Sequence, residues 1–76
     1  MIGVIYLNQT VKQAIDELPE RITTIRLYNY EGMWLGTLDR NDAIEKYGHY
    51  IYTAGYSDGF TEIAIWILKP NKMIKN

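Results

Sequence analysis

The sequence predicts a small α+β domain in which two short helices pack against a mostly antiparallel sheet. Two segments show the apolar spacing of a helix, and each follows a residue that typically caps one. Each helical segment is followed by two stretches rich in β-branched and aromatic residues, which favour strands. An acid-glycine pair, Glu31-Gly32 or Asp58-Gly59, separates the two stretches, as is typical of hairpin turns.

The expected order of elements is β-α-β-β-α-β-β. Residues 4–7 form a short apolar run that predicts the first strand. Thr10 is expected to cap the first helix, with Gln13 at the capping-box position. The next two strands are expected on either side of Glu31-Gly32.

Asp39 is expected to cap the second helix in the same way. Gly48 follows the last apolar residue of that helix, so we expect it to close the helix in a left-handed conformation. The final two strands flank the Ser57-Asp58-Gly59 turn, and Pro70 is expected to stop the last strand.

With 76 residues, the chain has room for one hydrophobic core. We expect one domain over residues 1–68 and a flexible basic tail over residues 69–76, which holds Lys69, Lys72 and Lys75. No stretch reaches the roughly 18 apolar residues that a membrane span needs, so no membrane partner is expected. The absence of cysteine is typical of a reducing compartment and favours the cytoplasm.

The register of the last hairpin decides which aromatic side chains share a face. A three-residue loop with Gly59 in a bulge pairs Tyr56 with Phe60 and places Tyr50 and Tyr52 opposite the core. A two-residue turn places Tyr50 and Tyr52 on the core side instead. We expect the three-residue loop, because it separates an aliphatic face from an aromatic one. The aliphatic face of the last strand consists of Ile63, Ile65 and Ile67.

The opposite face then gathers the candidate partner-binding residues. Aromatic side chains are enriched at protein interfaces because they bury a large area at low entropic cost. The helices could instead cover this face, and the residues alone leave both arrangements open. The candidate partner-binding residues are Tyr50, Tyr52, Tyr56, Asp58, Phe60, Glu62 and Trp66.

The residues do not predict an enzyme, and we expect no catalytic residue, no metal site and no cofactor. His49 is the one histidine, so a histidine metal cluster cannot form, and its place after a helix favours a structural role. Ser57 is the one serine and lies in a turn without an oxyanion-hole motif, which argues against acyl transfer.

Single-stranded nucleic acid is a weaker candidate partner than protein. Bases could stack on the aromatic residues, but the nine acids all lie between Asp16 and Glu62 and leave the body of the chain acidic. Few lysines and arginines remain near the predicted sheet to neutralise phosphates.

The style of the sequence also suggests a group of proteins. Thr10-Val11-Lys12 opens an amphipathic helix, Ile25-Arg26-Leu27-Tyr28 leads into a turn, and the chain is rich in Ile, Tyr, Lys and Asn. In these features it resembles the short orphan proteins of phages and mobile elements from low-GC Gram-positive bacteria.

That group includes anti-CRISPR inhibitors, which typically occupy a protein surface without catalysis. The resemblance therefore implies a non-enzymatic interaction protein that acts in the bacterial cytoplasm and binds a host protein, such as a CRISPR effector or another defence nuclease. The alternative is a structural or regulatory homo-oligomer, with a homodimer formed through the same aromatic face or through an uncovered sheet edge.

Overall fold

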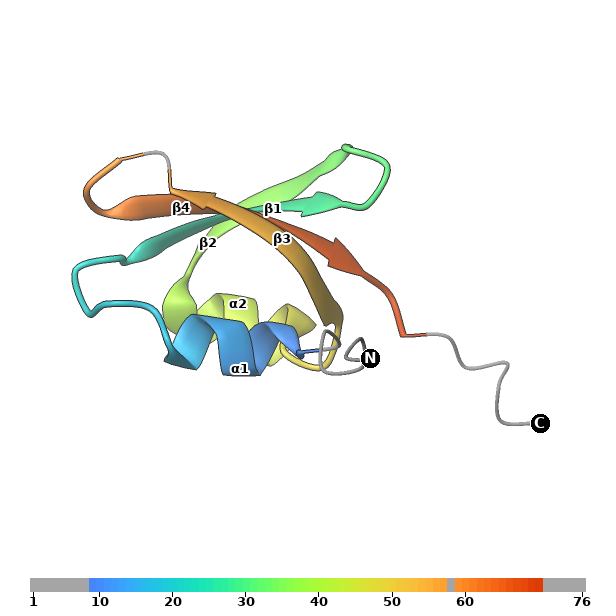
Figure 1. Ribbon diagram of the computed structural model, residues 1–76, viewed down its shortest axis with the longest axis horizontal. Coiled ribbons are helices and arrows are strands. Elements are labelled where there is room, and N and C mark those ends of the chain that lie inside the picture. The colour runs from blue at the N-terminus through green and yellow to red at the C-terminus, as the bar shows by residue number, and fades with distance from the viewer. Residues whose placement is uncertain (1–8, 58, 71–76) are drawn as a thin grey trace, which may run out of the picture.

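The computed structural model describes residues 9–57 and 59–70, which form a four-stranded sheet with both helices on one face (Figure 1). The predicted α+β class is confirmed. The elements follow the predicted order from the first helix onward. The predicted strand over residues 4–7, Asp58 and the tail beyond Pro70 lie outside the described residues. The elements are α1 (Val11–Asp16), β1 (Thr24–Asn29), β2 (Trp34–Asp39), α2 (Arg40–Tyr47), β3 (Ile51–Ser57) and β4 (Glu62–Leu68).

The sheet has the strand order β2-β1-β4-β3. The two hairpins, β1 with β2 and β3 with β4, are antiparallel. They join through a parallel pair, β1 with β4, in which Ile25 lies beside Ile63 and Leu27 beside Ile65. The sheet is therefore mixed, and its two central strands come from different halves of the chain.

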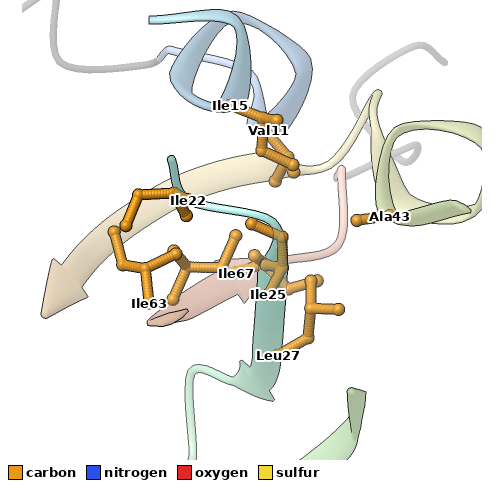
Figure 2. Close-up of a cluster of buried hydrophobic side chains, with 9 residues drawn as sticks. Val11, Ile15, Ile22, Ile25, Leu27, Ala43, Ile63 and Ile67 are labelled. Carbon is orange, nitrogen blue, oxygen red and sulfur yellow. The ribbon is translucent and has the colours of Figure 1, made fainter. Parts of the chain in front are cut away.

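The hydrophobic core lies between this sheet and the helices (Figure 2). As predicted, the three alternating isoleucines of β4 are buried on the helix side. Ile25 and Leu27 of β1 lie beside them, and α1 contributes Val11 and Ile15. Alternation along the strands thus directs every second side chain of the central pair toward the helices.

Local signals act as expected at the start of both helices. The Thr10 hydroxyl accepts a hydrogen bond from the Gln13 backbone nitrogen (3.1 Å), and the Gln13 side chain accepts one from the Thr10 nitrogen (2.9 Å). This is the predicted capping box. Asp39 caps α2 by accepting a hydrogen bond from the Asp42 nitrogen (2.8 Å), also as predicted.

The prediction for Gly48 is wrong in its conformation. Gly48 ends α2 with φ −57° and ψ −29°, which is right-handed. The backbone of α2 itself leaves no room for a side chain here, because a Cβ would overlap the carbonyl oxygen of Ile44, four residues earlier. The carbonyl of Gly48 also accepts a hydrogen bond from the backbone nitrogen of Lys12 (3.0 Å), so the end of α2 supports the start of α1.

The guanidinium group of Arg40, in the first turn of α2, lies against the C-terminal end of α1. Its two terminal nitrogens donate hydrogen bonds to four backbone carbonyls, those of Ile15 (2.7 Å), Leu18 (3.2 Å), Pro19 (2.7 Å) and Ile22 (2.9 Å). Carbonyls at the end of a helix have no partner within the helix, and the negative end of the helix dipole favours a cation there. Arg40 therefore closes α1 and joins it to α2.

Candidate functional site

The pairing of β3 with β4 differs from both predicted registers. Tyr56 lies opposite Ala64 and not opposite Phe60. The pair nearest the loop is Ser57 with Ile63, so the loop is longer than three residues. A bulge between Tyr52 and Ala54 shifts the register once more. Thr53 is the extra residue, and its hydroxyl donates a hydrogen bond to the carbonyl of Trp66 (2.8 Å).

This register divides the predicted aromatic face. Tyr52 pairs with Ile67 and packs against the core on the helix side, where its hydroxyl lies over Gly55 and leaves no room for a Cβ. Tyr50 also packs against the core and meets Tyr47 edge to face, with ring centroids 5.1 Å apart. The prediction that Tyr50 and Tyr52 share a face with Trp66 is therefore wrong.

The remaining predicted residues that the structure describes lie apart from that core. Tyr56, Glu62 and Trp66 lie on the sheet face opposite the helices. Phe60 lies in the loop between β3 and β4, 73% exposed, with the guanidinium carbon of Arg21 4.8 Å from the centre of its ring. Asp58 is outside the described residues, so its predicted role stays a prediction.

Two aromatic residues that the prediction missed complete this face. Tyr28 of β1 lies beside Trp66 of β4 and opposite Trp34 of β2, and Trp66 lies opposite Ala54 of β3. The row therefore crosses all four strands. The rings of Tyr28 and Trp66 stack with centroids 5.0 Å apart and planes 17° apart. We call the side of the sheet away from the helices the open face. Its aromatic residues are Tyr28, Trp34, Tyr56 and Trp66.

Exposure differs among these four side chains. Trp34 is 61% exposed and Tyr56 is 63% exposed, whereas Tyr28 and Trp66 at the centre are half-buried. Ala64 lies on the same face, between Arg26 of β1 and Tyr56 of β3, and is buried because these neighbours are longer. The open face therefore has a packed aromatic centre and two exposed rings on its outer strands.

The charges at the centre of the open face neutralise each other. Arg26 Nε lies 2.6 Å from Glu62 Oε2, an ion pair across the parallel strands. The same guanidinium donates a hydrogen bond to the Tyr28 hydroxyl (3.2 Å). Both charged side chains are partly shielded from water. The ion pair therefore leaves little net charge for a ligand, and its main effect is to hold the neighbouring ring of Tyr28 in place.

The structure does not bring together His49 and Ser57, the histidine and the serine weighed in the sequence. His49 lies in the turn before β3 and Ser57 at the far end of that strand, which spans about 20 Å at the usual rise per residue. Within residues 9–57 and 59–70 no three acidic, histidine or cysteine side chains gather as a metal site would require. Neither helix in that part of the chain is long and apolar enough to cross a membrane.

Two hollows lie on the helix side of the molecule. One, of about 320 Å³, is lined mainly by apolar groups at the end of the sheet and has Tyr30, Tyr47 and Tyr50 around it. The other, of about 440 Å³, lies beside α2 and is lined by Leu38, Asp42, Glu45 and Lys46. Neither contains the convergent set of buried polar groups that fixes a small ligand in its site.

Comparison of the chain with protein-family models, with curated proteins and with solved structures finds no match.

Proposed function

We propose that this protein is a non-enzymatic interaction module that binds a partner protein on the open face of its sheet. The observation that carries the proposal is the exposure of Trp34 and Tyr56 on a face that neither helix covers (Figure 1). Exposed aromatic residues around a packed aromatic centre match the composition of interface hot spots. The stacked pair of Tyr28 and Trp66 provides a rigid base, so little side-chain entropy would be lost on binding.

Protein is a better-supported partner class than nucleic acid because two arginines near the sheet already have partners. Arg26 pairs with Glu62 on the open face, and Arg40 is held by the carbonyls at the end of α1. Affinity for nucleic acid depends mainly on cations that neutralise phosphates. A neutral aromatic surface supports binding to a protein instead.

The resemblance to anti-defence proteins of phages and mobile elements suggests where to look for the partner. An inhibitor of that kind would occupy a functional surface of a host protein, and CRISPR effector nucleases are the first candidates to test. Glu62 would then lie beside the contact in its ion pair with Arg26, and the role of Asp58 stays a prediction.

The test uses a double variant of the open face and a matched control. Trp34→Ala with Tyr56→Ala should weaken binding to a captured host protein at least tenfold, since truncating an aromatic hot spot costs about 1–2 kcal/mol or more. Tyr30→Ala should leave the dissociation constant unchanged, because Tyr30 is also 63% exposed but lines the hollow on the helix side. Calorimetry with the purified partner gives the dissociation constants of the double variant and of the Tyr30→Ala control. Equal binding by the double variant and the wild type would disprove the proposal.

The homo-oligomer remains the alternative, and light scattering separates it from the proposal. A module that binds a host protein is expected to be a monomer by itself. A dimer that the Trp34→Ala, Tyr56→Ala variant converts to a monomer would assign the open face to a second copy of the chain and not to a host protein.

A further inference from the structure

The aromatic residues of the open face form a row that crosses the strands. Trp34, Tyr28 and Trp66 are successive neighbours on β2, β1 and β4, since Tyr28 pairs with Trp34 on one side and with Trp66 on the other. Neighbouring strands lie about 4.8 Å apart, so the backbones that carry the two tryptophans are about 9.6 Å apart. Tyr56 continues the aromatic surface on β3, diagonally from Trp66.

The spacing of the two tryptophans matches the repeat of one kind of peptide backbone. A polyproline II helix has three residues per turn and rises about 3.1 Å per residue, so residues i and i+3 lie on one side about 9.3 Å apart. Side chains on one face of a β-strand repeat every 6.8 Å or about that, and successive turns of an α-helix lie about 5.4 Å apart. A polyproline II segment that crosses the strands can therefore place successive turns on Trp34 and Trp66.

The hydrogen-bonding groups of the row also suit such a segment. A polyproline II helix makes no internal hydrogen bonds, so its backbone carbonyls can accept from a partner, whereas the carbonyls of an α-helix are used within the helix. The indole nitrogens of Trp34 and Trp66 are donors. The Tyr28 hydroxyl accepts a hydrogen bond from Arg26 Nη1 (3.2 Å) and keeps its own proton to donate. The row thus offers donors to a backbone that offers acceptors.

The charges beside the row favour an uncharged occupant. Arg26 and Glu62 form their ion pair next to Ala64, on the same face of the sheet. A charged side chain on a partner would meet both members of this pair, one attractive and one repulsive, and would lose hydration without a matching gain. Proline carries no charge, and its ring fixes the backbone before binding, so little conformational entropy is lost.

We propose that the partner of the open face is an uncharged, proline-rich segment in the polyproline II conformation. It would lie across the strands, with prolines i and i+3 against the rings of Trp34 and Trp66. Aromatic surfaces recognise such segments because the segment is already in its binding conformation. The inference rests on the proposed function for the position of the site, and it adds the chemistry of the partner.

A titration followed by nuclear magnetic resonance tests this with two uncharged peptides of equal length. One is an oligoproline of about ten residues with blocked ends, and the other is a blocked glycine-serine peptide, which is flexible. The oligoproline should shift the indole signals of Trp34 and Trp66 with a dissociation constant below about 1 mM, and the glycine-serine peptide should not. No shift, equal shifts from both peptides, or shifts confined to the hollow around Tyr30 would overturn the proposal.

Variants of the exposed rings locate the contact. Trp34→Ala should weaken oligoproline binding at least about fivefold, while Trp34→Phe keeps a ring and should retain most of the affinity. Tyr30→Ala is the matched control, because Tyr30 is equally exposed but lines the hollow on the helix side. The amide spectrum of each variant reports whether it is folded. Equal affinity of the wild type and folded Trp34→Ala would overturn the proposal.

The captured host protein separates this inference from the proposed function. If the Trp34→Ala, Tyr56→Ala variant loses the host protein but the wild type does not bind oligoproline, the inference falls and the proposed function stands. If that variant binds the host protein as the wild type does while the wild type binds oligoproline, the proposed function falls and the peptide site stands. An amphipathic helical peptide that displaces oligoproline at lower concentration, or a dimer in light scattering that buries Trp34, would assign the face to another occupant and overturn the inference.

Discussion

At the scale of single residues, Arg40 connects more backbone groups than any other side chain of residues 9–57 and 59–70. It holds four carbonyls that follow one another around the end of α1, at 2.7 to 3.2 Å. Replacing it with methionine keeps much of its apolar stem but leaves these carbonyls without their charged donor. We expect Arg40→Met to lower the free energy of unfolding by about 2–4 kcal/mol, which urea denaturation followed by circular dichroism can measure.

Two further variants show whether geometry or charge is responsible. Arg40→Lys should recover only part of the loss, because an ammonium group cannot direct separate donors to four carbonyls as the planar guanidinium does. Lys46→Met removes an exposed cation from the last turn of the same helix and should change stability by no more than about 0.5 kcal/mol. If Arg40→Met lowers the free energy of unfolding as little as Lys46→Met does, Arg40 does not hold α1 in place.

At the scale of elements, the turn between β1 and β2 depends on one side chain. The Asn29 side-chain oxygen accepts hydrogen bonds from the backbone nitrogens of Glu31 and Met33, both at 2.9 Å, while Gly32 takes a positive φ of 92°. Asn29→Ala should lower the melting temperature by roughly 4–12 °C, for a loss of about 1–2 kcal/mol. Asn29→Asp keeps an oxygen that can accept both hydrogen bonds and should melt within a few degrees of the wild type. Equal losses in the two variants would show that these hydrogen bonds do not stabilise the turn.

Elements that local chemistry specifies could be predicted from the sequence. The capping residues Thr10 and Asp39 and the Glu31-Gly32 turn each act within a few neighbouring residues, and all three are found where expected. The parallel pairing of β1 with β4 joins segments from different halves of the chain, and no local signal predicts it. For this reason Tyr28 and Trp34 were absent from the predicted site.

The wrong placement of Tyr50 and Tyr52 in the last hairpin comes from one extra residue in β3. The side-chain period of a strand is two residues, so one extra residue transfers everything before it to the other face. Thr53 is that residue. Its hydrogen bond to the Trp66 carbonyl is a tertiary contact, which no local sequence pattern predicts. Tyr50 and Tyr52 consequently pack against the core, while Tyr56, beyond the bulge, and Trp66 of β4 lie on the open face.

At the scale of the whole molecule, the sheet separates stability from the proposed binding. Its helix side carries the buried aliphatic residues, and its open face carries the exposed rings of Trp34 and Tyr56. A chain of this size has a free energy of unfolding of only about 4–11 kcal/mol. Substitutions on the helix side should therefore lower it by a clearly larger share than substitutions on the open face.

Substitutions on the two faces of the central and outer strands can measure this separation. Ile65→Ala should lower the free energy of unfolding by about 2–5 kcal/mol, because Ile65 is 1% exposed and its truncation leaves a cavity. The Trp34→Ala, Tyr56→Ala variant should lose no more than about 1 kcal/mol, since both side chains are mostly in water. Urea denaturation followed by far-ultraviolet circular dichroism compares them without relying on tryptophan fluorescence. A loss in the double variant as large as that of Ile65→Ala would mean that the exposed rings support the fold, and weaker binding by that variant could then no longer be attributed to a lost contact with the partner.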